Sequence, residues 1–356
     1  MRAMKEQRKT MITQVLDANS PEGIALGARL LREGELVGFP TETVYGLGAN
    51  ALDREAVLSI FAAKGRPADN PLIMHIWHRD QLAGLCEIPE GAEELMDAFW
   101  PGPLTLLFPR TEKVPDAVTA GLPTVAVRMP SMECTRALLK ACGLPVAAPS
   151  ANRSGRPSPT TAAHVMEDME GRIPLILDGG SCQVGLESTV LDLTRGAPTV
   201  LRPGGITREM IEKVLGRHVA LAGSILRPLA EGEKALSPGM RYRHYAPQGT
   251  VTLVEGAERD VVAALRDRCL GDRAAGKRSC VLCFTEHMEA LADCSPHDIG
   301  SARDEAQVAH RLFDILRQLD QEGMETVYSE VLPPEGVGLA VMNRLGRAAA
   351  FRTIRV

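Results

Sequence analysis

Apolar and polar positions alternate between two spacings along the first ~215 residues of the chain. Apolar residues three and four apart indicate amphipathic helices, and short apolar runs bounded by Gly or Pro indicate buried strands. The segments with helical spacing are 21–34, 53–65, 93–100, 131–143, 160–171 and 206–216. The strand-like runs are 35–48 (turn-rich at its end), 70–77, 104–109, 123–130, 144–151, 173–180, 187–194 and 197–205. This alternation predicts an α/β domain. We expect Ser131 to cap the helix that ends at Gly143.

The same alternation restarts at residue 250 after a stretch without periodicity. Strand-like runs at 250–256, 279–286 and 326–332 are separated by helical spacing at 260–272 and 304–323. This order predicts a second, smaller parallel sheet with helices on its faces. We therefore expect a first domain over 10–216, a linker over 217–249 and a second domain over 250–356. The linker motif LSPGMRYRHYAPQG mixes cations with aromatics, so it is either a plain spacer or a segment that covers a site.

Composition narrows the classes of function. Apolar residues make up 45% of the chain, aromatic residues 4%, and the formal net charge is -5. These values argue against a dedicated nucleic-acid binder, which needs a basic surface or stacking aromatics. We see no apolar run of the ~18 residues that a membrane helix requires and no signal peptide at the start, so we expect a cytoplasmic protein. Eight irregularly spaced cysteines indicate reduced thiols.

The motif KGRPADNP places two cations on a stiffened turn. Lys64 and Arg66 follow a helical segment, and Pro67 and Pro71 restrict the backbone around them. Ammonium and guanidinium groups held in this way suit phosphate or carboxylate ligands. The alternative is a helix end whose cations only favour the helix dipole.

Other polar clusters also follow predicted strands. PTETVYGLG places Thr41, Glu42 and Thr43 at a strand exit, and APSANRSGRPSPTT combines hydroxyls, arginines and a glycine that can form an anion nest. Arg128 and Arg202 each end a strand-like run. Ligands of open α/β sheets bind at strand exits. Together these clusters predict a pocket for an anionic, phosphate-bearing small molecule.

Two further motifs resemble known binding sites but lie in a sequence context that argues against such a site. GDRAAGKRS is close to a phosphate-binding loop, but Arg278 occupies the Ser/Thr position, and the segment follows a helix rather than a strand. Cys280 and Cys283 lie in an apolar run without a second ligand pair, which indicates core thiols. The sequence predicts no protein metal site, covalent nucleophile or dedicated general base.

The ordered motifs resemble the YrdC-like family. They are FPTETVYGLG, KGRPADNPL, FWPGPLT, VAVRMP, PSANRSGRPSPT, ESTVLDL and LRPGG, and SPGMRYRHYAP with the second domain resembles the two-domain threonylcarbamoyl-AMP synthases. The resemblance implies a twisted mixed sheet with helices and a smaller Rossmann-like parallel α/β domain. It implies a nucleotidyltransferase that condenses L-threonine, bicarbonate and ATP to threonylcarbamoyl-AMP and pyrophosphate. The product then serves the machinery that transfers threonylcarbamoyl to tRNA.

The resemblance also implies roles for individual residues. The expected catalytic residues are Lys64 and Arg66. The expected ATP contacts are Lys64, Arg66, Asn70, Thr124, Ser150, Asn152, Ser158, Arg202 and Tyr242, with Tyr245 as the alternative to Tyr242. The expected threonine contacts are Thr41, His75, Arg128, Ala148 and Ser188. Mg²⁺ is expected to arrive on the ATP phosphates.

Two questions stay open at this level. The competing function is an RNA-binding or ribosome-associated module without catalysis, and a weak contact with tRNA is compatible with either function. The second domain could act as a lid or as a docking site for a partner.

Overall fold

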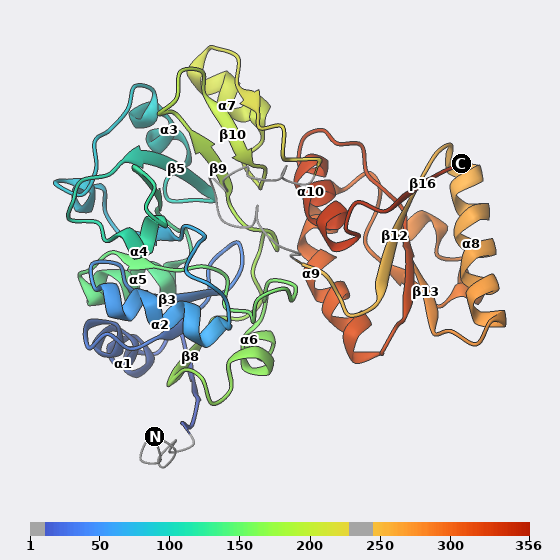
Figure 1. Cartoon of the computed structure of the whole chain (residues 1–356), viewed down its shortest axis with the longest axis horizontal. Coiled ribbons are helices and arrows are strands. Elements are labelled where there is room, and N and C mark those ends of the chain that lie inside the picture. The colour runs from blue at the N-terminus through green and yellow to red at the C-terminus, as the bar shows by residue number, and fades with distance from the viewer. Residues whose placement is uncertain (1–10, 228–244) are drawn as a thin grey trace.

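The computed structural model describes residues 11–227 and 245–356. It contains two sheets (Figure 1). The first is mixed, eleven-stranded and ordered β1-β8-β2-β3-β7-β4-β6-β5-β9-β10-β11, and the second is five-stranded, ordered β14-β13-β15-β12-β16. Every strand pair in the second sheet is parallel. The predicted mixed sheet and smaller parallel sheet are both confirmed.

The first sheet runs from the N-terminal part of the described chain to Leu221. Its strands are β1 (Gln14–Asp17), β2 (Val37–Phe39), β3 (Gly46–Asn50), β4 (Ile73–His75), β5 (Leu104–Pro109), β6 (Thr124–Arg128), β7 (Val146–Ala147), β8 (Leu175–Asp178), β9 (Thr189–Asp192), β10 (Thr199–Arg202) and β11 (Ala220–Leu221). The accompanying helices are α1 (Pro21–Arg32), α2 (Arg54–Lys64), the 3-10 turn η1 (Arg79–Leu82), α3 (Ala92–Phe99), α4 (Asp116–Thr119), α5 (Glu133–Cys142), α6 (Ala162–Met169) and α7 (Arg208–Leu215).

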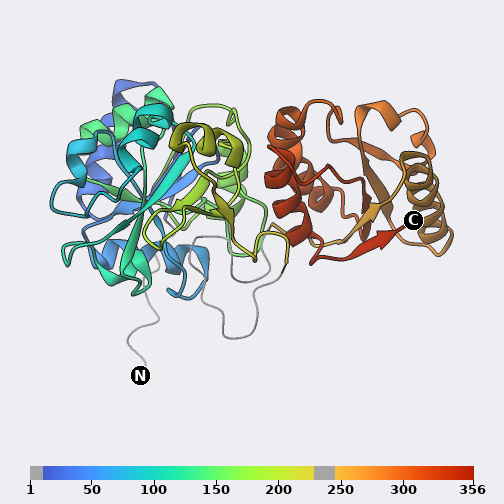
Figure 2. The ribbon, with the colours of Figure 1, turned by 90° about the horizontal axis from the view of Figure 1, so that it is seen from above.

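The second domain contains the predicted strands and helices in their predicted order, and in addition β14, α10 and β16, which were not predicted. Its strands are β12 (Thr250–Glu255), β13 (Ser279–Cys283), β14 (Pro296–Asp298), β15 (Thr326–Ser329) and β16 (Thr353–Arg355). Its helices are α8 (Glu258–Ala274), η2 (Thr285–His287), η3 (Ala292–Cys294), α9 (Glu305–Gln321) and α10 (Gly338–Ala348). Figures 1 and 2 show α9 and α10 on the side that faces the first domain and α8 on the opposite face of the sheet.

Two local predictions need correction. The segment 35–48 is not one strand but the antiparallel pair β2 and β3, and its Thr-rich part forms the connection between them. The helix expected from Ser131 begins at Glu133, with Met132 at the N-cap and no capping side chain. Ser131 instead donates its backbone N–H to Glu42 Oε2 at 3.2 Å. The carboxylate of Glu42 therefore draws this residue into the loop beside the pocket.

An apolar cluster joins the two domains. It contains Val44 and Leu186 from the first domain and Leu312 and Phe313 from α9, all buried. Tyr245 belongs to the same cluster, and its ring stacks on Phe313 with centroids 5.1 Å apart. Because this apolar surface is removed from water only when the domains are in contact, it favours a fixed arrangement.

Candidate active site

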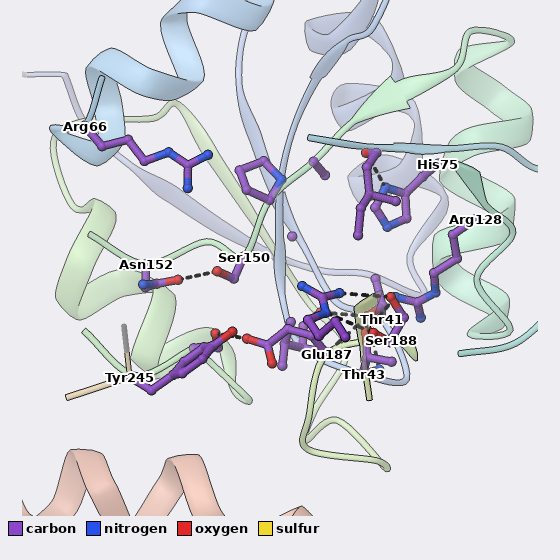
Figure 3. A pocket seen from close by; sticks show the side chains of 17 residues that line it. Thr41, Thr43, Arg66, His75, Arg128, Ser150, Asn152, Glu187, Ser188 and Tyr245 are labelled. Atoms are coloured by element: carbon purple, nitrogen blue, oxygen red, sulfur yellow. Dashed lines mark hydrogen bonds between the residues drawn. The ribbon is translucent and has the colours of Figure 1, made fainter. Parts of the chain in front are cut away.

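A pocket lies where several strands of the first sheet end, and it contains about 620 Å³ of empty space including its open mouth. Its walls combine three arginines, one histidine, one glutamate and several hydroxyl and amide groups. The predicted residues that line it are Thr41, Arg66, His75, Arg128, Ala148, Ser150, Asn152, Ser158, Ser188 and Arg202. Segments separated by more than a hundred residues thus meet at one cavity (Figure 3).

Arg128 is fixed at one side of the pocket. It ends β6, in register with His75 of the parallel strand β4. Its guanidinium donates to Thr43 Oγ1 at 2.7 Å and to the Gly102 carbonyl at 3.2 Å, and it pairs with Glu42 at 2.6 Å. A guanidinium has five N–H donors, so these three contacts leave donors for a ligand. The buried charge is compensated and its orientation is set before any ligand binds.

Thr41 and Thr43 form a compact turn beside Arg128. Thr41 Oγ1 accepts from the backbone N–H groups of Thr43 and Val44 and donates to the Val44 carbonyl at 2.7 Å. The two threonine hydroxyls lie 2.8 Å apart. Thr43 was recognised in the sequence as part of a polar turn but was not assigned a role. Its position shows that it holds the Arg128 guanidinium.

His75 contributes a neutral imidazole to this side of the pocket. Burial, followed by the nearby positive charge of Arg128, lowers the pKa of His75 from 6.5 to about 3, although backbone carbonyls partly oppose this. Its Nδ1 lies 3.1 Å from the Ile73 carbonyl, which fixes the proton on that nitrogen. The imidazole can therefore hydrogen-bond a ligand but adds no charge near neutral pH.

Arg66 lies on the opposite side of the pocket (Figure 3). It follows α2, whose end is set by Gly65 in the left-handed conformation with φ of 65°. The guanidinium lies over the Phe61 ring at 5.2 Å and donates to the Asn70 carbonyl at 3.4 Å. The cation is thus presented by packing against its own helix and turn.

Lys64 does not line the cavity but supports its wall. Its ammonium group is buried and donates to the carbonyls of Ser150 and Asn152. Burial, and next the charge of Arg66, hold the pKa of Lys64 well below its usual value. Ser150 and Asn152 are also linked to each other by a 2.5 Å bond from the hydroxyl to Oδ1. Lys64 therefore fixes the loop that presents these two groups.

Two other predicted residues, Asn70 and Thr124, lie away from the lining, and a third cannot be placed. Asn70 is fully buried beside Arg66, and its carboxamide has no hydrogen-bond partner within the described residues. Thr124 begins β6, about 13 Å along the strand from Arg128. Tyr242 lies outside the described residues. Its alternative, Tyr245, is buried and lines the pocket.

Glu187 and Arg202 lie close together on the remaining wall. Glu187 Oε1 accepts from the Ser158 hydroxyl at 2.5 Å, and Oε2 accepts from Arg344 of α10 at 3.0 Å. Burial alone would raise the pKa of Glu187, but Arg344, Arg202 and the Ser158 hydrogen bond outweigh it, and the net shift is downward.

The other two polar groups of this wall, Ser188 and Arg202, are tied together. Arg202 donates to the carbonyl and hydroxyl of Ser188 at 3.1 and 3.2 Å. Glu187 opens the ESTVLDL motif, but the sequence assigns it no role in the site. Its partner Arg344 lies 157 residues away, so only the fold reveals the pair.

Within the described residues, no helix is long and apolar enough to cross a membrane. Those residues also contain no group of three or more His, Cys, Asp or Glu side chains arranged to hold a metal ion.

Comparisons with known proteins agree with the two-domain architecture. Residues 29–204 match the Sua5_yciO_yrdC family model, described as telomere recombination. Residues 206–350 match the model of the threonylcarbamoyl-AMP synthase C-terminal domain.

Similar proteins cover nearly the whole chain. The chain is 47% identical to a threonylcarbamoyl-AMP synthase of Pyrococcus abyssi over 98% of its own length and 100% of that protein. It is 46% identical to the Bacillus subtilis protein of the same name, with 97% of each chain covered. The crystal structure of Pyrococcus abyssi Sua5 complexed with L-threonine superimposes with a TM-score of 0.88 and 45% identity, over 97% of this chain and 98% of that one. This chain belongs to the threonylcarbamoyl-AMP synthase family, in its two-domain form.

Proposed function

We propose that this pocket makes threonylcarbamoyl-AMP and pyrophosphate from L-threonine, bicarbonate and ATP. The observation that carries the proposal is the convergence of Arg66, Arg128 and Arg202 on one cavity. Three cations from distant segments suit a reaction in which several anions must come together. Family membership supplies the substrates, and the geometry supports how this chain would hold them.

The reaction joins like charges. The threonine amine attacks the carbon of bicarbonate, or of the CO2 derived from it, and gives a carbamate with loss of water or a proton. A carbamate oxygen then attacks the α-phosphorus of ATP, and pyrophosphate leaves with the electrons of the broken P–O bond. Both the carbamate and the triphosphate are anionic, so positioning and fixed positive charge lower the barrier. This account needs no covalent intermediate with the protein.

Threonine would occupy the side of the pocket around Arg128. The carboxylate suits the remaining N–H donors of the Arg128 guanidinium, whose orientation is set by Thr43 and Gly102. The neutral His75 adds a hydrogen-bonding group without extra charge. The further contacts on this side would be Thr41, Ala148 and Ser188. The complex of the Pyrococcus abyssi protein with L-threonine supports an amino-acid site in this fold.

The nucleotide would occupy the side around Arg66. Figure 3 shows Ser150 and Asn152 on this side, across the cavity from Arg128. Asn70 stays a proposed nucleotide contact beside the Arg66 turn, and its buried carboxamide has no hydrogen-bond partner within the described residues. Ser158, Arg202 and the loop held by Lys64 complete the proposed phosphate contacts. Thr124 stays a proposed nucleotide contact although it does not line this cavity, and Tyr242, which lies outside the described residues, stays one as well.

Mg²⁺ would enter as part of the ATP complex. The carboxylate that lines the pocket, Glu187, already accepts hydrogen bonds from Ser158 and Arg344. A hard cation that keeps several waters can instead be held by the phosphates. The protein's residues would then bind the complex through its outer oxygens, and the ion would neutralise part of the triphosphate charge.

The chemistry of the proposed product indicates which kind of enzyme must act after this one. Threonylcarbamoyl-AMP carries an activated acyl group, which must be consumed by an enzyme that transfers it to tRNA. We propose a cytoplasmic location and a weak contact with tRNA at most, in keeping with the net charge of -5.

The test is direct detection of product. The purified chain is incubated with ATP, Mg²⁺, L-threonine and bicarbonate, and threonylcarbamoyl-AMP and pyrophosphate are quantified by mass spectrometry and a coupled assay. We expect product only when all the substrates are present. Pyrophosphate release that does not require threonine, or tight tRNA binding without any turnover, would reject the proposal.

A further inference from the structure

Two arginines of the second domain are buried against the wall of the pocket. Arg344 in α10 is 0% exposed and Arg317 in α9 is 1% exposed. A guanidinium stays charged in proteins, so burying one is unfavourable unless several acceptors surround it. In both cases the first domain supplies most of those acceptors.

Arg344 is connected to the cavity through one intermediate residue. It donates from Nε to Glu187 Oε2 at 3.0 Å, from Nη2 to the Glu187 carbonyl at 3.2 Å and from Nη1 to the Pro203 carbonyl at 2.5 Å. The other oxygen of Glu187 accepts the Ser158 hydroxyl. Glu187 and Ser158 both line the pocket. The hydrogen bonds from Arg344 to Glu187, and from Ser158 to Glu187, therefore connect α10 to the pocket wall.

Arg317 holds the same loop from its other side. It donates from Nη2 to the Pro157 carbonyl at 2.7 Å and to Asp168 Oδ2 at 2.6 Å. Asp168 also binds Arg156. The Arg156 carbonyl in turn accepts from Asn152 Nδ2 at 2.9 Å. The loop from 152 to 158 is thus held between α9 and α10.

We infer that the second domain is a fixed part of the nucleotide wall and that Arg344 is a positioning residue for the reaction, acting through Glu187 on Ser158. This inference rests on the function proposed above. It differs from a lid, because opening the interface would expose to water the apolar cluster around Phe313, which is buried in the structure.

The electrostatics of Glu187 supply a distinguishing readout. Arg344 and Arg202 lower its pKa, and the Ser158 hydroxyl adds to this. Lys64 and Tyr245 also interact electrostatically with this carboxylate. Removing Arg344 takes away the largest of the opposing charges, so burial raises the pKa of Glu187. Protonation of Glu187 would then begin at a higher pH and weaken its bond from Ser158.

The experiment compares Arg344→Met and Arg344→Lys with wild type. Steady-state kinetics are measured from pH 5 to 9, ATP binding is measured by calorimetry, and folding is checked by circular dichroism. For Arg344→Met we expect the KM for ATP to rise roughly tenfold or more, the scale of a lost hydrogen bond to a charged group. The KM for threonine should change much less. The acidic limb of the kcat/KM profile should move to higher pH than in wild type.

Two further variants make the test specific. Adding Glu187→Gln to Arg344→Met removes the carboxylate that has lost its main counter-charge, so the double variant should lose the shifted acidic limb and regain part of the ATP affinity. Gln321→Ala removes an interdomain bond of 2.7 Å to Glu167. Within the described residues neither of these two side chains lines the cavity or is hydrogen-bonded to Glu187, and Glu167 keeps its pairing with Arg317. This control should keep wild-type kinetics.

Each outcome of these experiments either supports or overturns the role inferred for Arg344. Folded Arg344→Met with unchanged KM for ATP and an unchanged acidic limb would overturn the inference. If that variant does not fold, Arg344→Lys is judged by the same two quantities, because it keeps the charge but cannot reach all three acceptors. If wild type forms no product, the proposed function fails, and the calorimetric ATP affinities alone then decide whether Arg344 shapes the wall.

Discussion

The buried His75 should make the stability of this protein depend on pH in a specific window. The imidazole is neutral in the folded chain because burial and Arg128 lower its pKa to about 3, whereas an exposed histidine titrates near 6.5. The unfolded chain therefore binds a proton below pH 6.5 that the folded chain does not. This differential binding destabilises the folded state as the pH falls.

The magnitude follows from the two pKa values. Between pH 8 and pH 5, protonation of His75 stabilises the unfolded state by a free energy equivalent to about 1.5 pH units. The folded state is stabilised by almost nothing over the same range, because its His75 stays neutral. At 1.36 kcal/mol per unit, His75 alone should lower the free energy of unfolding by about 2 kcal/mol. The other histidines add their own pH dependence to the free energy of unfolding. The quantity to measure is therefore the difference in unfolding free energy between wild type and a variant that lacks only the His75 imidazole.

The matched variant is His75→Asn, which keeps a donor that can reach the Ile73 carbonyl but cannot be protonated. Urea unfolding of both chains is followed at pH 8, 6.5 and 5. We expect wild type to lose about 2 kcal/mol more than the variant between pH 8 and pH 5. Parallel stability curves for the two chains would refute the reasoning, because they would mean that His75 is already charged or is accessible to protons in the folded state.

Three other substitutions test separate parts of the structure. Arg66→Ala should lower kcat/KM roughly 10²–10³-fold, the scale of one preorganised charge contact, with little change in unfolding free energy; a fully active variant would contradict its placement in the site. Lys64→Met should cost roughly 2–4 kcal/mol of stability in urea unfolding, because two buried carbonyls lose their donor; an unchanged midpoint would contradict this supporting role. Gly185 has a φ of 76°, and in Gly185→Ala the new Cβ would lie 2.5 Å from His310 Cα of the second domain. This variant should be clearly less stable than Gly196→Ala, whose Cβ would meet open space at a φ of 74°. Equal effects of the two substitutions on thermal unfolding would argue against the tight domain contact.

Sequence periodicity was sufficient for the architecture but not for its local geometry. The second domain was predictable because its buried parallel strands, such as Ser279–Cys283, are continuous apolar runs between well-defined helices. The β2–β3 pair was not separable, because its connecting residues carry the polar groups of the pocket rather than a standard turn. Ser131 resembled a helix cap because the sequence does not reveal that Glu42 accepts its N–H.

The candidate site could be predicted where chemistry is local and not where it depends on the fold. Arg66 and Arg128 are recognisable because each follows a strand or a stiff turn. The support given by Lys64 to the 150–152 backbone and by Arg344 to Glu187 depends on contacts between residues 86 or more positions apart. No periodicity or spacing encodes such pairs, so they follow only from three-dimensional packing.

The proposed function requires that one cavity holds the nucleotide and the amino acid side by side. A crystal structure of this chain soaked with L-threonine and a non-hydrolysable ATP analogue tests it most directly. We predict the threonine carboxylate at Arg128 and the triphosphate near Arg66, with the α-phosphorus facing the amine in the same pocket. Ligands bound in two separate cavities, or a nucleotide that makes no contact with the Arg66 side, would contradict the account.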